Sequence, residues 1–404
     1  INVYFMADDK TGYIRLERFA ATSQTEFDSA INKLKALGMK NLIFDLRGNG
    51  GGYLNVAFAI ADEFIKNGQM IVYTDNFRKT GENFKATKFG NFEEGKLIIL
   101  VDEGSASASE IVSGAIQDWD RGLIMGRRTF GKGLVQKPLI LTDKSELRLT
   151  ISHYYTPTGR CIQKPYDDGI DSYQRELTER YKHGEYLTPD SISFPDSLKY
   201  YTPNKRVVYG GGGIMPDIFI PMDTTKYSSL FNELFRKGVF GAFTLDYMDS
   251  YRKELLSKYP TISDFKNNFQ ISDEMYSQLM DYAKKEGVND SVPFNFTSRI
   301  GYFIKDEKNK LDSLYSNIED LENCKEFEEM LIKYMKDSYS ESLKLRNLDK
   351  APIYIKEYLK FEIARNMFSF GEAYQIFLLS DDAFLQAIQL IQDDKTFKKF
   401  KVTH

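Results

Sequence analysis

A serine-rich turn and a lysine 25 residues beyond it are the residues of this sequence best suited to chemistry. Ser107 lies in the small-residue segment 104–110, GSASASE, and Lys132 lies in the segment 129–133, TFGKG. A serine hydroxyl attacks a carbonyl when a neighbouring base takes its proton. A helix that begins just after the serine would direct free backbone N–H groups at the oxyanion that forms. The pattern predicts acyl transfer by a serine nucleophile with a lysine base.

Three serines alternate in the segment 104–110, and spacing alone does not identify the nucleophile. Ser109 fits the N-cap of the following helix, where a serine side chain accepts a hydrogen bond from the first turn. Ser105 and Ser107 both stay open as nucleophiles. The sequence has three histidines, none in a recognisable catalytic setting, so a lysine base is favoured over a Ser-His-Asp triad.

Lysine acts as a base only when its amine is neutral. Its ordinary pKa of about 10.4 must fall by roughly 3 units, at a cost of about 4 kcal/mol, and desolvation can lower it in this way. Lys132 lies between two glycines and near Phe130, Leu134 and Val135, a setting compatible with desolvation; an exposed lysine in a glycine turn is the alternative. Gln136 would share one face of an extended segment with Lys132 and could orient the amine.

Residues 107–119 have the pattern of a turn that leads into an amphipathic helix. Asp118 lies near the end of this helix, roughly 16 Å from Ser107 along the axis. A structural salt bridge or a cap is therefore favoured for Asp118 over contact with the nucleophile.

A glycine cluster at 47–52, RGNGGG, follows the apolar strand-like run 41–46. A glycine turn between a strand and a helix exposes backbone N–H groups in a concave nest that suits an anion. One of these groups could be the second oxyanion donor beside the N–H of Ala108. The alternative is that the glycines are needed only for turning.

One rival motif is a phosphate-binding loop. Residues 126–132 have the spacing G-x-x-x-x-G-K, but Gly133 stands where a Ser or Thr must bind Mg²⁺. The following residues also have an extended rather than a helical pattern. Nucleotide binding is therefore disfavoured.

The element pattern predicts an α/β fold with two domains. Strands are expected at 12–17, 41–46, 97–102 and 146–153, and a helix at 24–37. A polar stretch at about 164–205 is predicted to be an insertion, either a flap over a cleft or a disordered loop. From about 223 onward, apolar residues recur at helical spacing, as in Phe327, Met330, Leu331 and Tyr334, so residues 223–404 are expected to form a helical domain.

The gross composition excludes some classes of protein. A formal charge of −4 without a long single-sign block gives no reason to expect nucleic-acid binding. Cys161 and Cys324 are the only cysteines, too few for a disulfide scaffold or a cysteine zinc site, and their pairing cannot be judged from the sequence. No metal or organic cofactor is expected.

Taken together, these motifs resemble the carboxyl-terminal processing proteases, also called tail-specific proteases, a family of Ser/Lys endopeptidases. The segments NLIFDLRGNGGGYL, GSASASEIVSGAIQDW and GRRTFGKGLVQ are similar to the family's glycine turn, nucleophile helix and lysine segment, in its order and spacing. The segment RVVYGGGGIMPDI is similar to the end of its core. The resemblance covers residues 12–221, and the predicted protease core is residues 1–222.

The resemblance implies a role for each site residue. Ser107 is the nucleophile, Lys132 the general base and Gln136 its orienting partner. The implied oxyanion donors are Ala108 and a glycine of the turn, Gly51 or Gly52. An acidic residue of the family matches Asp118, for which a supporting role is expected. The implied fold is a crotonase-like α/β core with a mixed sheet and packed helices.

The sequence departs from the family in one respect. Family members usually carry a PDZ domain that binds substrate C-termini, and the residues before Gly12 leave no room for one. The helical region after 223 resembles C-terminal extensions of some bacterial relatives. By resemblance, the location is a bacterial periplasm or cell envelope, with peripheral envelope association and homo-oligomerisation both left open.

The leading hypothesis is a serine endopeptidase that cleaves proteins or peptides near their C-termini, with activity that rises with pH until Lys132 is neutral. A catalytically silent peptide-binding or scaffold protein on the same fold is the alternative. A third hypothesis, acyl-CoA chemistry, would not need Lys132.

Overall fold

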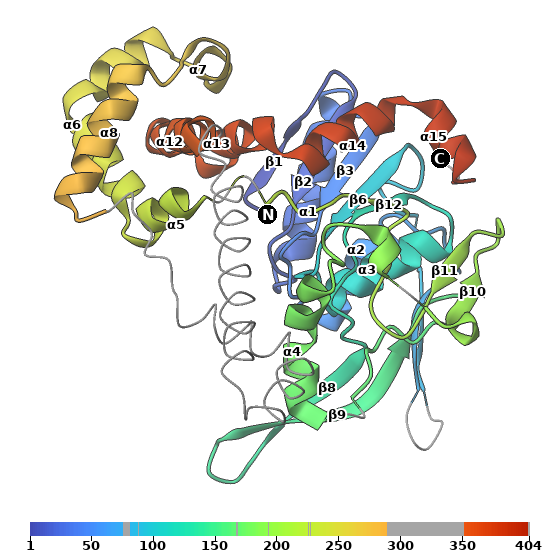
Figure 1. The fold of residues 1–404 in the computed structure, drawn as a ribbon. Helices are drawn as coiled ribbons and strands as arrows, with labels where there is room; N and C mark the ends of the chain where they lie inside the picture. Colours follow the sequence, from blue (N-terminus) through green and yellow to red (C-terminus); the bar gives the residue numbers. More distant parts are fainter. Residues whose placement is uncertain are drawn as a thin grey trace, which may run out of the picture. The chain divides into compact units, whose positions relative to one another are not determined.

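The structure is a computed structural model that describes residues 1–75, 81–87, 89–166, 169–192, 194–224, 226, 228–288 and 351–402. Its contacts divide the chain into two compact units (Figure 1). The first unit comprises residues 1–222 and 370–404, and the helical unit comprises residues 223–369.

The first unit is built around a six-stranded mixed sheet of order β1-β2-β3-β6-β7-β12. Strand β1 is antiparallel to β2, and the other neighbours are parallel. The strands are β1 Val3–Met6, β2 Thr11–Arg15, β3 Asn41–Asp45, β6 Leu97–Val101, β7 Leu123–Gly126 and β12 Ile218–Phe219. Three of the predicted strands correspond to β2, β3 and β6. Strand β6 is buried along its whole length, because it lies in the middle of a sheet that is covered on both faces.

A second, antiparallel sheet has the order β5-β4-β9-β8. Its strands are β4 Met70–Asp75, β5 Asn83–Lys85, β8 Leu134–Ile140 and β9 Glu146–Tyr155, the last of which corresponds to the strand predicted at 146–153. Strands β8 and β9 form a hairpin that projects from the first unit (Figure 1). Because β8 begins just after Lys132, the base of this hairpin adjoins the lysine segment. A separate pair is formed by β10 Lys199–Tyr201 and β11 Val207–Tyr209.

Alternating side chains of the central sheet enter two different apolar cores. Leu42 and Phe44 belong to one core, which includes the helices α1 Ser23–Ala36, α2 Leu54–Asp62 and α3 Ala108–Asp118. Ile43, between them in β3, belongs to the second core. Helices α1 and α3 confirm the predicted helices at 24–37 and after Ser107.

The second core is covered by the C-terminal segment, residues 370–404. Its helices are α13 Phe370–Phe377, α14 Asp382–Gln392 and α15 Asp394–Lys399, and Phe384, Ala387 and Ile391 of α14 are buried in the core. The prediction of one helical domain over 223–404 is therefore wrong for these residues, which belong to the first unit. Helical spacing predicts that a helix buries one face, but not which surface covers that face.

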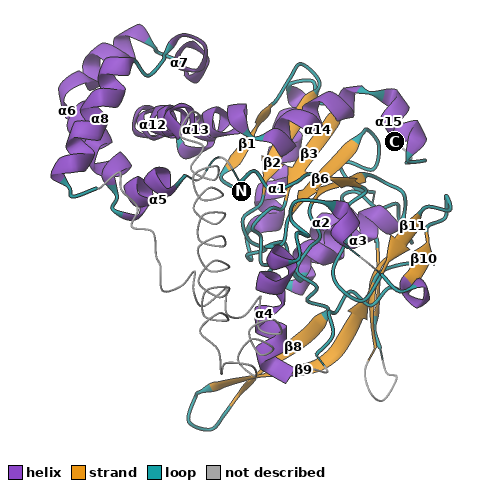
Figure 2. Cartoon of the chain, in the orientation of Figure 1, coloured by secondary structure: helices purple, strands orange, loops and turns teal. Residues whose placement is uncertain are grey.

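The helical unit contains α5 Ser229–Arg236, α6 Val239–Lys258, α7 Ile262–Asn268, α8 Asp273–Lys285 and α12 Ala351–Met367. Its described residues form no strand (Figure 2). The rings of Phe231 and Phe240 lie 5.4 Å apart, and the ring of Tyr358 lies 4.7 Å from that of Phe240. Residues 327–334, which were used to predict this helical region, and Cys324 lie outside the described residues.

The predicted insertion at 164–205 is ordered where the structure describes it. It contains helix α4 Gly169–Lys182, the short helical turns η1 Pro189–Ser191 and η2 Asp196–Leu198, and strand β10. The Lys164 ammonium lies 4.1 Å from the ring centroids of Phe130 and Tyr173 and 3.1 Å from the Glu176 carboxylate. The disordered-loop alternative is therefore wrong for these residues. The segment is also held to the rest of the first unit by an ion pair between Arg128 and Glu185 at 2.6 Å.

Candidate active site

The predicted site residues meet where three neighbouring parallel strands end. Strand β3 leads into the glycine turn 47–52, β6 into the serine segment 104–110, and β7 into the loop 127–133, which carries Lys132. Sites in α/β proteins commonly lie at this edge of the sheet. Here a pocket of about 470 Å³ is lined by Ser107, Lys132, Gln136, Gly50, Gly52 and other residues.

Ser107 occupies the position just before helix α3 with a strained backbone. Its φ is 56° and its ψ is −110°, a combination that non-glycine residues rarely adopt. Strain of this kind costs about 1–3 kcal/mol and is concentrated at functional sites. The sharp turn exposes Ser107 to the pocket at the N-terminus of α3.

The structure separates Ser107 from the two serines beside it. Ser105 Oγ donates to the Leu46 carbonyl oxygen at 2.8 Å, and Ser109 Oγ donates to the Asn49 carbonyl oxygen at 2.8 Å. Both side chains are buried, and neither lines the pocket. The expectation that Ser109 is the N-cap is wrong, because Ser107 holds that position and Ser109 is already in the first turn of α3.

Lys132 is held in place through its backbone. Its N–H donates to Glu110 Oε2 at 2.8 Å, and its carbonyl oxygen accepts from the Tyr154 hydroxyl. Its half-buried side chain lines the same pocket as Ser107. Although both side chains line the pocket, no direct hydrogen bond joins them in the described structure.

Glu110 joins the serine segment to the lysine loop. Its buried carboxylate accepts from Ser107 N at 2.8 Å, Thr129 Oγ1 at 2.5 Å, Gly131 N at 2.6 Å and Lys132 N at 2.8 Å. Burial raises the pKa of Glu110, although these hydrogen bonds oppose the rise. Glu110 was not among the predicted site residues, although the capping-box spacing S-x-x-E from Ser107 to Glu110 could have indicated it.

Tyr154 of β9 is a second residue that the sequence did not reveal. Its side chain is buried and lines the pocket, and its hydroxyl donates to the Lys132 carbonyl oxygen. Burial and the nearby charge of Glu110 raise its pKa well above the usual range, whereas a hydrogen bond with the Ser107 side chain acts in the opposite direction. Tyr154 therefore contacts both residues of the predicted dyad.

Gln136, in strand β8, lines the same pocket as Lys132. The two side chains make no hydrogen bond in the part of the chain that the structure describes. Gln136 is therefore present in the pocket, but in this conformation it lacks the hydrogen bond to Lys132 that an orienting role would require.

The glycine turn lies against the nucleophile. A Cβ added to Gly51 would lie 2.8 Å from Ser107 Cβ, and Gly51 has a φ of +100°, so a side chain there would be both crowded and strained. The N–H of Gly51 donates to Asn49 Oδ1 at 2.9 Å, so the prediction that Gly51 supplies an oxyanion donor does not fit the structure. Within the described residues, the N–H groups of Gly52 and Ala108 have no such partner.

Asp118 lies in the last turn of α3, away from the pocket. Its buried carboxylate pairs with the buried Arg160 and accepts from Thr158 N at 2.9 Å and Thr158 Oγ1 at 2.7 Å. These contacts confirm the structural salt bridge favoured for Asp118. Its described contacts are with residues 158 and 160, not with Ser107.

The described residues contain no group of three His, Cys, Asp or Glu side chains that could hold a metal ion. None of the helices in the described part of the chain is long and apolar enough to span a membrane. What the site does present is a hydroxyl on a strained turn, an amine in the same pocket and backbone N–H groups at a helix start. These are the groups that acyl transfer uses.

Parts of the chain are similar to known proteins. Residues 10–172 match the family described as peptidase family S41, and residues 230–299 match a family of unknown function, DUF8443. The carboxyl-terminal-processing protease of Synechocystis sp. is 40% identical over 205 residues, which cover 50% of this chain and 46% of the relative. The carboxy-terminal-processing protease of Bartonella bacilliformis is 36% identical over 226 residues, covering 55% of this chain and 50% of the relative.

The chain is also similar to a solved structure, the photosystem II D1 C-terminal processing protease, with 26% sequence identity and a TM-score of 0.39. The match covers 53% of this chain and 43% of the solved chain. The chain thus spans half or less of the length of these relatives. The matched segment 10–172 contains Ser107, Lys132 and the glycine turn. Residues 10–172 thus match a peptidase S41 domain and are similar to the carboxyl-terminal-processing proteases.

Proposed function

We propose that this protein is a serine endopeptidase that cleaves polypeptides near their C-termini, with Ser107 as nucleophile and Lys132 as general base. The observation that carries the proposal is that Ser107, on a strained turn, shares one pocket with Lys132 while Glu110 binds the backbone N–H of both. A single buried carboxylate thus ties together the backbones of the two residues.

The first half of the mechanism forms an acyl-enzyme. Neutral Lys132 Nζ takes the proton of Ser107 Oγ, which bonds to the substrate carbonyl carbon and gives a tetrahedral oxyanion. The N–H groups of Ala108 and Gly52 stabilise this oxyanion. The intermediate collapses, the C–N bond breaks, and protonated Lys132 gives its proton to the leaving amine.

In the second half, water replaces the leaving amine. Lys132 takes a proton from the water, which attacks the acyl carbon, and the ester bond to Ser107 Oγ breaks as the oxygen regains a proton. Gln136 supports Lys132 when the lysine rotates toward Ser107, and Asp118 supports the site only through the loop that contains Thr158 and Arg160. No step needs a metal or an organic cofactor.

We also infer that the core has a crotonase-like fold formed by residues 1–222 and completed by residues 370–404. The substrates are proteins or peptides, and the location is the bacterial periplasm or cell envelope. This location comes from the family resemblance alone, and fractionation of the producing cells with an antibody to the chain tests it.

The test of function is cleavage of an unstructured protein, with products identified by mass spectrometry across pH 6–10. Wild-type chain is compared with Ser107→Ala and Lys132→Ala, and with Ser105→Ala as the matched serine control. We expect cleavage by wild type and Ser105→Ala, none by the other two, and a rate that rises with pH. Binding of the polypeptide without cleavage would support the silent scaffold instead. Cleavage that survives in Lys132→Ala would contradict the dyad.

A further inference from the structure

The glycine turn is anchored at its first residue by a buried ionic network. Asp45, at the end of β3, accepts from Arg47 Nη2 at 2.6 Å and from the Tyr13 hydroxyl at 2.6 Å. Asp45 is fully buried and Arg47 is largely so. Burial alone would raise the pKa of Asp45, but Arg47, Arg15 and Tyr13 outweigh it, and the pKa is lowered. The carboxylate is therefore ionised at neutral pH.

The C-terminal segment 370–404 completes this network. Asp381 binds Arg47 Nη1 with both carboxylate oxygens, each at 2.9 Å, and also accepts from Phe384 N at 2.8 Å as the N-cap of α14. The ring of Phe384 meets that of Tyr13 edge-on at 5.2 Å. The two carboxylates thus hold the Arg47 guanidinium from two sides, one from β3 and one from a residue 334 positions away.

Arg47 leads directly into the residues that face the nucleophile. Gly48 N donates to Asp102 Oδ1 at 2.8 Å, and the Asn49 side chain donates to the Leu16 carbonyl oxygen at 2.8 Å. The following glycines, Gly50 and Gly52, line the pocket with Ser107. Because Gly48 and Asn49 join Arg47 to these glycines along the backbone, a shift of Arg47 would move the start of the turn.

We propose that Asp381 is a positioning residue for the glycine turn, which it orders by holding Arg47. The proposal rests on the proposed peptidase function. It predicts that loss of the Asp381–Arg47 contact lowers oxyanion stabilisation more than substrate binding.

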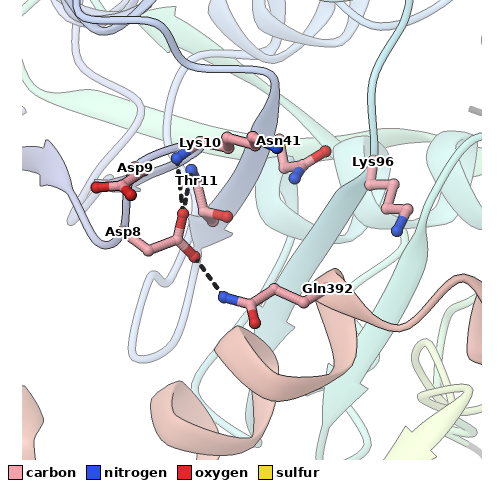
Figure 3. A pocket seen from close by; sticks show the side chains of 7 residues that line it. All are labelled: Asp8, Asp9, Lys10, Thr11, Asn41, Lys96 and Gln392. Carbon is pink, nitrogen blue, oxygen red and sulfur yellow. Dashed lines mark hydrogen bonds between the residues drawn. The ribbon is translucent and has the colours of Figure 1, made fainter.

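Two anchors at other points of α14 and α15 provide controls. Gln392, at the end of α14, donates to Asp8 Oδ2 at 2.9 Å in a pocket of about 530 Å³ at the opposite edge of the sheet (Figure 3). Lys96 in that pocket pairs with Asp394. The helices of the segment are therefore attached at both edges of the sheet, and of these three described contacts the one made by Asp381 leads to the turn.

The test uses the full chain and two substitutions at Asp381. Asp381→Asn keeps the shape and a capping oxygen but removes the charge, and Asp381→Ser keeps a helix cap but is too short to reach Arg47. Asp382→Asn, an exposed neighbour, controls for charge at the helix start. Gln392→Ala controls for attachment of the segment.

We expect Asp381→Ser to lower kcat by about tenfold with KM changed by less than about twofold, as for a small misplacement of a catalytic group. Inhibition by a peptidyl boronic acid, which forms a tetrahedral adduct, should weaken by the same factor. Asp381→Asn should show a smaller effect in the same direction. Both controls should keep wild-type kcat and boronate affinity.

Hydrogen exchange of residues 47–52 is the second readout, and it does not depend on activity. We expect faster exchange in Asp381→Ser than in wild type or Gln392→Ala. Unchanged exchange and unchanged kcat in a folded Asp381→Ser protein would overturn the proposal. An inactive wild type that binds no boronate would refute the peptidase function, and the exchange rates would then still decide whether Asp381 orders the turn.

Discussion

The two halves of the candidate site are held by different means. In the nucleophile half, Ser107 and Lys132 are fixed by Glu110, a carboxylate only three residues beyond the serine. In the oxyanion half, the glycine turn is fixed by Asn49 within it and, through Arg47, by Asp381 from the other end of the chain. One half is thus built from a nearly continuous stretch of sequence and the other from distant parts.

The two halves therefore differ in the interactions whose loss would disrupt them. The nucleophile half depends on one buried carboxylate whose pKa is raised by burial. The oxyanion half depends on ion pairs around Asp45, whose pKa is lowered. Substitutions and pH should therefore affect the two halves separately.

The largest effect is expected for Glu110→Gln. All the described partners of the carboxylate are donors, so an amide of the same shape would turn an NH₂ group toward one of them. Leaving buried donors without acceptors costs several kcal/mol in total, and we expect kcat/KM to fall by about 100-fold, or about 2.7 kcal/mol. Peptide cleavage and thermal unfolding measure the loss. Glu94→Gln, at an exposed glutamate, is the control, and full activity in Glu110→Gln would show that this carboxylate does not hold the dyad.

The next effect is expected for Gly51→Ala in the oxyanion half. The added Cβ would meet Ser107 Cβ and the Ala106 carbonyl oxygen at 2.8 Å each, at a φ of +100°. Strain of about 2 kcal/mol corresponds to about a 30-fold loss of kcat. Gly48→Ala lies in the same turn and also has a positive φ, but no atom lies within 4 Å of the added Cβ, so this variant separates strain from crowding. If both variants keep wild-type kcat, close approach of the turn to Ser107 is not needed.

A smaller effect is expected for Tyr154→Phe, which removes only the hydroxyl that contacts both members of the dyad. Loss of one buried hydrogen bond costs about 1 kcal/mol, so kcat should fall by about fivefold to tenfold. Tyr155→Phe, the neighbouring tyrosine in β9, is the matched control. Equal kcat values for the two variants, measured with the same peptide, would show that the Tyr154 hydroxyl does not contribute to catalysis.

The smallest effect is a difference in acid stability. Since the pKa of Asp45 is lower in the folded than in the unfolded state, its contribution is present above the ordinary value of about 3.9 and is lost as pH falls through the lowered value. Glu110 has a raised pKa and therefore contributes in the opposite sense. We expect the urea unfolding free energy of the wild type to fall below about pH 4, and Asp45→Asn to flatten that slope. If the unfolding free energy of Asp45→Asn falls with pH as steeply as that of the wild type, groups other than Asp45 cause the loss of stability in acid.

The nucleophile half was largely predictable because its signals are local. Ser107 follows the strand predicted at 97–102, whereas β7, the strand that leads to Lys132, was not predicted. Glu110 lay within the same motif. Tyr154 was not predictable, because alternation along β9 gives the face of a residue but not the partner that the face meets.

The oxyanion half needed the fold. Asp381 belongs to helices whose spacing predicts a buried face without saying which surface covers it. The sequence also suggested Gly51 as a donor, because it could not show that Asn49 accepts the Gly51 N–H. Long-range contacts of this kind are decided by tertiary packing and leave no local pattern.

The most direct test of the account is covalent labelling of the wild-type chain with a fluorophosphonate, mapped by peptide mass spectrometry from pH 6 to 10. We predict a single adduct on Ser107, a labelling rate that rises with pH, and no labelling in Lys132→Ala or in unfolded chain. An adduct on another serine, or equal labelling of folded Lys132→Ala, would contradict the assignment of Ser107 and Lys132 as nucleophile and base.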